Sequence, residues 1–426
     1  VARGNGGTAI ALSGLTPAEV AELAGRELGR TVGEEESGAI HEATGGNPFF
    51  VKELLRGAGG APGAALSPSA LPGGVRVLLD QRIGRISAGC VALLSSAAVA
   101  GRELEPALLA RVCGVDAGAV EDCIAEATSE GVVRAAAGRG LRFAHDLMRE
   151  ALVARVPAAR RAELHRQIGE ALETLPSAEG EPDLTRVAFH LCEGASAGGG
   201  LPALEVAVRA AERAMERHAL EEARGLLLRA EPVLEGEPEA SDALRLRLLL
   251  DLGEVRMILG EPSEGRAALL ASAELARRTG DAHALARAGL ALGGTDLSPD
   301  VAVPDPAQVG LLGESIAGLP PELSELRVRV AVRLAMMLHF SGSPEGVAAI
   351  WDEVMPAVTN GAAEPAVRAH ALYGRRWILV DPDDLPIRLE ESGEIIRLGR
   401  EAGRRDLELA GHACRFADHV ELGRMP

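Results

Sequence analysis

The apolar residues of this chain are almost all aliphatic, and many of them are small. Hydrophobic residues make up 47% of the 426 positions, but the aromatic residues are only six Phe, two Trp and one Tyr. Most other apolar side chains are Ala, Leu and Val, and the frequent Ala and Arg residues favour helices. Small side chains also let helices approach closely. We therefore expect a mainly α-helical protein with helix-on-helix packing and roughly two to four domains.

One segment indicates how these helices pack. Residues 244–279 fit two amphipathic helices joined by a Gly-Glu-Pro turn. Gly253, Gly265 and Ser272 stand where the two helices would touch, and Leu269 lies among them. Small residues at such contacts are typical of tetratricopeptide (TPR) repeats, which are about 34 residues long.

Similar helix pairs are expected over most of residues 158–426. Segments 203–234, 321–358 and 364–403 fit the same pattern, and prolines interrupt it at 294–306. The sequence therefore predicts a TPR-like α-solenoid for residues 158–426.

The first residues predict a strand followed by helices. The apolar run at 8–12 resembles a strand. Residues 16–19, Thr-Pro-Ala-Glu, are a helix start, with Thr as the N-cap, Pro at the first position and Glu three residues after the cap. We expect this helix to run to Leu28 and a second helix to cover 34–43.

A linker and a domain of mixed structure follow. Residues 57–74 are rich in Gly, Pro and Ser, which indicates a flexible connector. Residues 75–157 predict short helices, then a hairpin around a Gly-containing turn, then another helix. The helices are expected at 75–86, 87–100, 103–113 and 116–130, and the hairpin strands at 131–134 and 141–143. Helices followed by a small hairpin predict a winged-helix domain.

The chain contains one lysine, Lys52, and all its other basic residues are arginine. A P-loop needs a lysine after its glycine-rich turn to reach the phosphates of a nucleotide. Lys52 follows Phe50-Val51 with no glycine loop before it. The chain therefore lacks an ordinary phosphate-binding loop of its own.

The overall charge and composition exclude several other functions. The formal net charge is −18, which argues against binding nucleic acid through a basic surface. No apolar stretch approaches the roughly 18 residues of a membrane span, so no membrane contact is expected. The histidines and cysteines show no metal-ligand spacing, and no catalytic residue is expected.

The five cysteines are scattered and include no CxxC pair. We expect them to be reduced, mostly buried thiols, which favours a cytoplasmic protein.

Three segments together resemble a known protein family. Residues 44–55, Thr-Gly-Gly-Asn-Pro-Phe-Phe-Val-Lys-Glu-Leu-Leu, resemble the TGGNPFF segment of large ATP-binding regulators of the STAND class, among them the LuxR-type regulators related to MalT. Residues 141–152 and 157–165 resemble the run that follows the winged helix in these regulators, and residues 375–389 resemble their repeat region. The resemblance covers nearly the whole chain.

The resemblance implies roles for four residues. Gly46, Asn47 and Pro48 match the turn that packs against the adenine, and His145 matches the histidine that senses the ADP phosphate. An imidazole near a phosphate gains a proton and a charge-assisted hydrogen bond. The alternatives remain open: residues 46–48 could be an ordinary corner between helices, and His145 a helix-start residue satisfied by backbone.

The resemblance also implies the domain layout. Residues 1–56 correspond to the C-terminal lid helices of an AAA/STAND ATPase, followed by the linker, the winged helix and the repeats. The Walker A and B elements are absent, and the DNA-binding helix-turn-helix would lie beyond Pro426. We therefore expect a piece of a longer protein whose ATP/ADP cofactor is not demonstrable in this chain. This piece is not expected to be an enzyme, and ATPase activity of the full-length protein stays open.

The expected function is the sensory part of an ATP-dependent transcriptional regulator. The repeats would bind an effector ligand or regulatory protein, DNA would be contacted only through the missing helix-turn-helix, and self-association on activation is left open. Two alternatives remain: the sensory region of a class III adenylate or guanylate cyclase or of a kinase, and a free-standing TPR-like scaffold.

Overall fold

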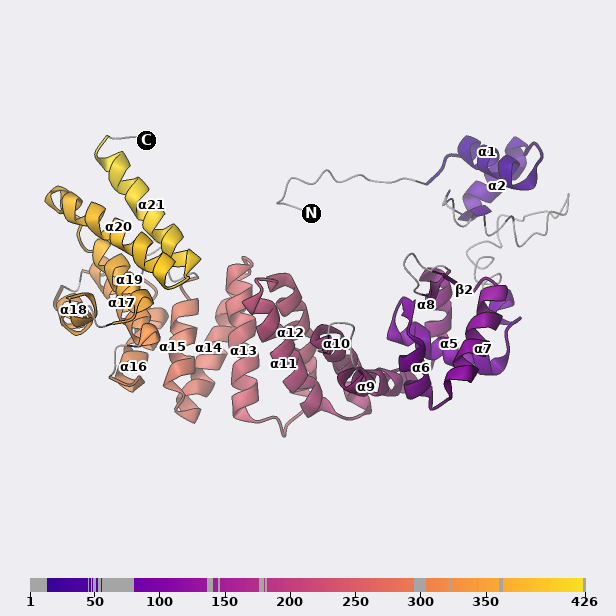
Figure 1. Ribbon diagram of the computed structural model, residues 1–426, viewed down its shortest axis with the longest axis horizontal. Helices are drawn as coiled ribbons and strands as arrows, with labels where there is room; N and C mark the ends of the chain where they lie inside the picture. The colour runs from indigo at the N-terminus through magenta and orange to yellow at the C-terminus, as the bar shows by residue number, and fades with distance from the viewer. Residues whose placement is uncertain are drawn as a thin grey trace. The chain divides into compact units, whose positions relative to one another are not determined.

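The computed structural model consists of two compact units, Val1–Pro176 and Ser177–Pro426, which are considered separately (Figure 1). The structure describes residues 14–44, 46, 48, 51–52, 55, 80–135, 141–144, 146–175, 180, 182–294, 304–321, 324–342, 344–359 and 363–423. The expected strand at 8–12 and linker at 57–74 lie outside these ranges.

The first two expected helices are present as α1 (Pro17–Leu28) and α2 (Glu34–Thr44). Thr16 and Glu19 form the predicted capping box: the Thr16 hydroxyl accepts a hydrogen bond from the Glu19 amide, and the Glu19 carboxylate accepts one from the Thr16 amide. The inner faces of α1 and α2 share one apolar cluster with Val51 and Leu55.

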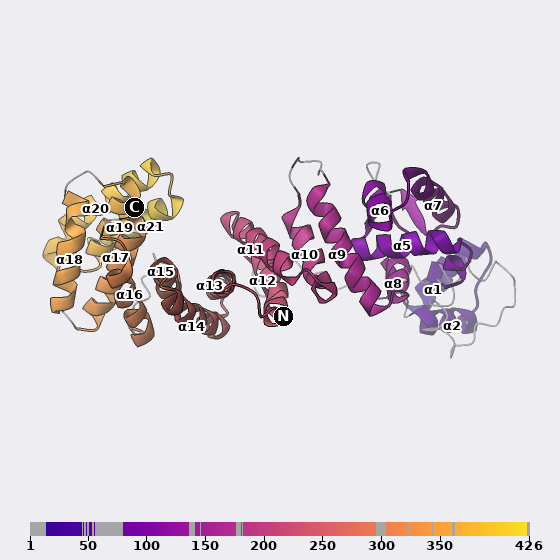
Figure 2. The same ribbon diagram turned by 90° about the horizontal axis from the view of Figure 1, so that it is seen from below.

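The rest of the first unit contains helices around a small antiparallel sheet (Figure 2). Its elements are α5 (Ala88–Ala100), β1 (Glu103–Leu104), α6 (Pro106–Cys113), α7 (Ala117–Ser129), β2 (Val133–Ala135), β3 (Leu141–Phe143), α8 (Asp146–Ala154) and α9 (Ala158–Thr174). The predicted hairpin strands β2 and β3 pair antiparallel, and the sheet order is β1-β3-β2. Assignment of this fold as a winged-helix domain stays a prediction.

The helix predicted at 103–113 is wrong in its first turn. Glu103 and Leu104 form β1 and pair with Arg142 and Leu141 of β3. Pro106 then occupies the first helical position of α6, where its missing amide hydrogen is not needed. The proline marks the true start of the helix.

Helix α9 packs against α5 and α6 within the first unit. Leu164 and Ile168 of α9 share an apolar cluster with Val99 and Leu108. Helix α9 thus belongs to the compact unit that ends at Pro176, and the start of the repeats at residue 158 stays a prediction.

The second unit is built from successive helices, as expected for a TPR-like solenoid (Figure 1). They are α10 (Leu184–Gly194), η2 (Ala195–Ala197), α11 (Gly200–Glu216), α12 (Leu220–Glu235), α13 (Asp242–Ile258), α14 (Pro262–Thr279), α15 (Ala282–Ala291), α16 (Pro306–Gly318), α17 (Glu325–Phe340), α18 (Pro344–Thr359), α19 (Pro365–Arg376), η3 (Pro382–Asp384), α20 (Leu385–Glu401) and α21 (Arg405–Glu421). The helix pairs expected at 203–234, 244–279, 321–358 and 364–403 are all present.

The repeats are longer than predicted. Helices α13, α15, α17, α19 and α21 begin at residues 242, 282, 325, 365 and 405, so successive repeats start about 40 residues apart rather than about 34. Helices of 16 to 18 residues, such as α13, α14 and α17, account for part of the extra length.

In two of the hairpins, glycines let the two helices approach each other closely. A Cβ atom on Gly253 would lie 2.7 Å from Cγ of Leu269, and one on Gly265 would lie 3.0 Å from Met257, which confirms the predicted contact of α13 with α14. In the α20–α21 hairpin, a Cβ on Gly399 would lie 2.6 Å from the backbone nitrogen of Glu408. A side chain at Gly253 or Gly399 would therefore force neighbouring atoms to move.

Between α10 and α16, four ion pairs connect a helix to the second helix along. They link Arg229 of α12 to Glu193 of α10, Arg247 of α13 to Glu212 of α11, Arg287 of α15 to Glu254 of α13, and Arg277 of α14 to Glu314 of α16. The partners are 33 to 37 residues apart, so each pair joins neighbouring repeats.

A buried ion pair joins the last helices. Asp418 of α21 is fully buried and accepts a hydrogen bond of 2.6 Å from Nη2 of Arg376 in α19. Arg388 of α20, also buried, lies 3.9 Å from the same carboxylate. Within the described residues, none of the helices is both long enough and apolar enough to cross a membrane.

Candidate functional site

The corner at residues 46–48 is fixed by Gly46. Its φ is +71°, its carbonyl accepts a hydrogen bond of 2.7 Å from the Leu15 amide, and a Cβ there would lie 2.1 Å from the Leu15 carbonyl oxygen. Pro48 is helical and exposed. Asn47 and His145 lie outside the described residues, so the structure does not test whether the four predicted nucleotide-binding residues come together.

The only lysine serves a structural contact. Nζ of Lys52 lies 3.0 Å from a carboxylate oxygen of Glu27 in α1. The ion pair ties the residues after the corner to the first helix.

The first unit contains a cavity of about 940 Å³ between α5, α7 and the start of α9. Its lining is mostly apolar, and two of its polar side chains are hydrogen-bonded to glutamates. The Ser87 hydroxyl donates to Glu126 at 2.8 Å, and Arg160 donates to Glu163 at 2.7 Å.

Two cysteines in the wall of this cavity form a disulfide, Cys90–Cys123, which joins α5 to α7. Their Cα atoms are 5.0 Å apart, within the range of disulfides. The expectation that all five cysteines are reduced is therefore wrong for this pair. Cys113, Cys192 and Cys414 are free thiols, and burial raises the pKa of Cys192 to about 12.

The second unit carries a cavity of about 540 Å³ that is lined by three successive repeats. We call it the groove cavity. Its lining residues come from α13, from α15 and the residues just after it, and from α17. They are Glu254, Ile258, His283, Arg287, Leu290, Ala291, Gly294, Glu325, Leu326 and Arg329. Its volume lies within the range typical of small-molecule sites, roughly 300–1,000 Å³.

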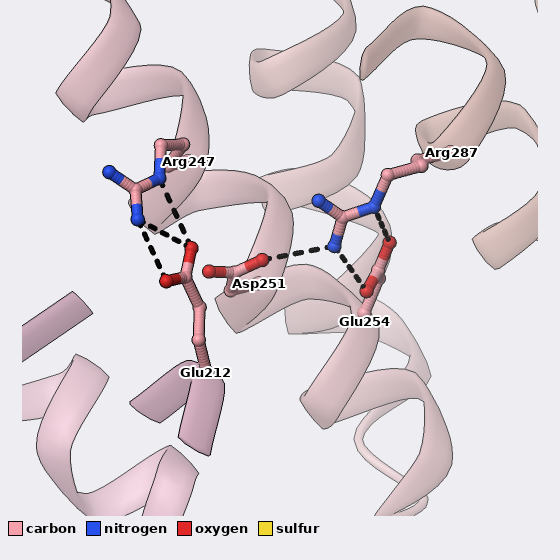
Figure 3. A network of polar contacts seen from close by, with 5 residues as sticks. All are labelled: Glu212, Arg247, Asp251, Glu254 and Arg287. Atoms are coloured by element: carbon pink, nitrogen blue, oxygen red, sulfur yellow. Dashed lines mark hydrogen bonds and ion pairs between the residues drawn. The ribbon is translucent and has the colours of Figure 1, made fainter. Parts of the chain in front are cut away.

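Arg287 is the centre of a polar network beside this cavity (Figure 3). Its Nε donates to Glu254 at 3.0 Å, and its Nη2 donates to Glu254 at 2.8 Å and to Asp251 at 3.0 Å. Arg247 makes a second, bidentate pair with Glu212 on the other side of Asp251 (Figure 3). The network therefore connects α11, α13 and α15.

Asp251 makes the fewest hydrogen bonds of the residues in this network. It is only 2% exposed, and its Oδ2 has no hydrogen-bond partner within the described part of the chain. Burial raises the pKa of Asp251 to about 6, although the charge of Arg287 opposes the shift. Burial also favours a neutral Arg287, but the charges of Glu254 and Asp251 outweigh it and raise the Arg287 pKa. Buried carboxylate oxygens without a hydrogen-bond partner are uncommon in folded proteins, and carboxyl groups with a shifted pKa are found often at functional sites.

Sequence reasoning did not identify this network. Asp251 and Arg287 are 36 residues apart on helices with ordinary amphipathic patterns. The repeat pattern could have revealed it. When the helix pairs are aligned, the acidic residues of α13 and the arginine of α15 fall on neighbouring helices. Within the described residues, no group of three or more His, Cys, Asp or Glu side chains could hold a metal ion.

Comparison with solved structures gives a distant likeness. No family model matches the chain, and no curated protein matches it. Among solved structures, it is similar to a Signal Transduction ATPase with Numerous Domains (STAND) protein with a tetratricopeptide repeat sensor from Pyrococcus horikoshii, at 14% identity and a TM-score of 0.34. The match covers 97% of this chain and 66% of that one. A likeness at this level carries no argument about family, ligand or activity.

Proposed function

We propose that this chain is the sensory arm of an ATP-dependent transcriptional regulator of the STAND type, with a LuxR-type output. In this proposal an ATPase core binds ADP or ATP, and the repeats bind an effector. The effector shifts the equilibrium between the two nucleotide states only by its different affinity for them. A helix-turn-helix outside this chain contacts DNA.

The groove cavity is the observation that carries the sensory role. Three successive repeats line it with both charged and apolar side chains. A ligand there would contact α13, α15 and α17 together, so binding would favour one arrangement of these repeats over others. This is the physical requirement for a repeat array to report on an effector.

The corner at Gly46 supports the nucleotide role. The contact with Leu15 fixes the backbone there and leaves Pro48 exposed, so the proline is accessible to a neighbouring group. The resemblance in residues 44–55 assigns this corner to the adenine, and His145 to the ADP phosphate.

The test uses the full-length protein and a fluorescent ADP analogue. His145→Ala is expected to weaken ADP binding and to raise basal transcriptional activity, because a charge-assisted contact to the phosphate is lost. His412→Ala, at an exposed position of α21, is the matched control and should change neither. Unchanged ADP affinity in the His145 variant would reject the sensor role.

The alternatives give different results. The isolated 426-residue chain is expected to hydrolyse no ATP above background, since it lacks the Walker elements. An upstream reading frame with no P-loop would favour the free-standing scaffold. A cyclase or kinase domain in the same gene would favour the sensory region of a cyclase or kinase over a transcriptional output.

A further inference from the structure

The inner face of α21 is fixed against α20 (Figure 1). Leu407, Gly411 and Cys414 on this face are buried. A Cβ atom on Gly411 would lie 2.9 Å from the backbone nitrogen of Ile396 in α20, so the two helices are in close contact. This contact determines which side chains of α21 point outward.

The outer face of α21 carries an exposed apolar stripe. Leu409, Phe416 and Val420 are 70%, 56% and 46% exposed, and Ala413, which is also exposed, lies between them. Positions 409, 413, 416 and 420 are 4, 3 and 4 residues apart, which is the a and d spacing of a coiled coil. We call these four residues the α21 stripe. Large apolar side chains that gather on one exposed face are typical of an interaction surface.

Basic side chains follow one edge of the α21 stripe. Arg405, His412 and His419 are seven residues apart, so they repeat along the same side of the helix. Ala410 and Ala417 stand along the other edge. When two helices pack together, charges at such flanking positions select the partner.

The carboxylates of α21 are already engaged. Each accepts a hydrogen bond from an arginine that precedes the helix or belongs to α19 or α20, and the pairs are Asp406–Arg404, Glu408–Arg400, Asp418–Arg376 and Glu421–Arg388. The Arg405 guanidinium, by contrast, forms no hydrogen bond or ion pair with the described residues. The outer face of α21 is therefore basic, although the whole chain has a net charge of −18.

We propose that the α21 stripe docks an amphipathic helix of another protein, whose apolar face covers the stripe and whose acidic edge faces Arg405 and the two histidines. A second copy of this chain would present the same basic edge, with the α21 carboxylates already bound, so the charges favour an acidic partner. The inference goes beyond the proposed function, because it requires neither a nucleotide nor an effector in the groove cavity.

The shape of the stripe favours a helix as the docking element. From Leu409 to Val420 it rises about 17 Å, at about 1.5 Å per residue. A helix of about three turns covers that length and can pack its own a and d side chains between those of α21. Because Ala413 is small, a larger partner side chain has room between Leu409 and Phe416.

The first test offers the 426-residue chain two labelled peptides and measures binding by fluorescence anisotropy. Both peptides contain three heptads with Leu at a and d, and they differ only in Glu or Lys at e and g. We expect the Glu peptide to bind at least about fivefold more tightly, because only it can pair with the basic edge. The net charge of −18 favours the Lys peptide non-specifically, so this preference reports the local surface. Equal or tighter binding of the Lys peptide, or no binding of the Glu peptide, would overturn the proposal.

The second test removes the aromatic side chain from the stripe. Phe416 is exposed, so Phe416→Ser should leave the chain folded, which circular dichroism checks. The variant should bind the Glu peptide at least about tenfold more weakly, because buried aromatic side chains dominate such interfaces. Ile258→Ser removes a similarly exposed side chain from α13 and is the matched control, with no change expected. If the Phe416 variant binds as tightly as the parent chain, the peptide does not lie on the α21 stripe and the proposal fails.

The third test reverses the charge of the edge. Arg405→Glu should weaken binding of the Glu peptide several-fold and strengthen binding of the Lys peptide. Arg278→Glu, on the exposed surface of α14, should change neither affinity. An equal change for both peptides would show that the edge does not select a charge.

Two other occupants of the stripe would give different results. A second copy would make the chain a dimer that Phe416→Ser converts to a monomer, as seen by analytical ultracentrifugation. An anionic membrane would make the parent chain, but not the Phe416 variant, sediment with vesicles of phosphatidylcholine and phosphatidylserine. Either result would replace the acidic helix as the occupant. A monomer that ignores these vesicles and binds the Glu peptide supports the proposal.

Discussion

The α13–α14 and α20–α21 hairpins bring their helices together with the same spacing of glycines. Gly253 and Gly265 are 12 positions apart, and so are Gly399 and Gly411. In both hairpins a Cβ atom at these sites would meet atoms of the facing helix. The backbone packing of the two hairpins is therefore closely similar.

Their charged side chains are arranged differently. The residue two positions before the first glycine is the buried Asp251 in α13 but the exposed Arg397 in α20. The α20–α21 hairpin instead buries Asp418 on its second helix, against two buried arginines. Asp251 shares a single, partly exposed arginine with Glu254.

The difference separates two uses of a buried carboxylate. Around Asp418 the charges are enclosed and hold three helices together. Around Asp251 the charges border a cavity, which Glu254 and Arg287 line, whereas one carboxylate oxygen lacks a hydrogen-bond partner within the described residues at both sites. The first arrangement is suited to a structural joint and the second to a ligand-responsive site.

The largest expected effect is at the enclosed joint. Arg376→Met leaves Asp418 buried without its closest partner and should cost about 3–5 kcal/mol of unfolding free energy. Chemical denaturation followed by circular dichroism would measure it. The double variant Arg376→Met/Asp418→Leu should recover much of the loss, and a single-variant loss below about 1 kcal/mol would contradict an enclosed joint.

The stability cost of replacing a close-packed glycine should differ between the two hairpins, because the neighbouring atoms differ. Gly399→Ala pushes a methyl group against backbone at 2.6 Å and should cost about 2 kcal/mol, whereas Gly253→Ala meets mainly the Leu269 side chain, with backbone only at 3.1 Å, and should cost less, about 1 kcal/mol. Gly225→Ala, in α12, meets nothing within 4 Å and should stabilise slightly. Thermal unfolding of the three variants measures their order of stability. A Gly253 variant that is less stable than the Gly399 variant would contradict the prediction.

Asp251 should make stability depend on pH. Its folded-state pKa, about 6, lies above the ordinary value of 3.8, so its contribution is fully present below pH 3.8 and is lost as the pH rises through 6. Asn does not titrate. Asp251→Asn should therefore gain about 2 kcal/mol relative to the parent chain between pH 4 and pH 7.5. Denaturation of both chains at the two pH values measures this, and a constant difference would show that Asp251 is not perturbed.

The smallest effect is expected at Arg397. Its side chain is 53% exposed and pairs with Glu394 and Glu401 on its own helix. Arg397→Ala should leave the unfolding free energy almost unchanged, since exposed pairs contribute little. The same denaturation measurement checks it. A loss as large as that of Arg376→Met would show that exposure does not separate the two classes of ion pair.

Much of the fold could be predicted because its signals are local. The capping box at Thr16 and Glu19, the helix pairs and the contact at Gly253 each depend on residues close together in the chain. The strand at Glu103 was missed because two residues carry no periodicity, and only pairing with β3 makes them a strand.

The candidate site was harder to predict because it depends on distant partners. Nothing near Asp251 indicates that an arginine 36 residues later will meet it. Cys90 and Cys123 were missed for the same reason, since each lies alone on its own helix. The nucleotide-binding roles of Gly46, Asn47, Pro48 and His145 came from resemblance and stay predictions.

The ion pairs between neighbouring repeats should make the second unit elastic. Each pair joins one repeat to the next and contributes at most about 1 kcal/mol, so the repeats can shift relative to each other at small cost. Dissolved salt screens such exposed contacts over about 8 Å at physiological ionic strength. The stiffness of the second unit should therefore fall as the salt concentration rises, while the glycine contacts keep the α13–α14 and α20–α21 hairpins intact.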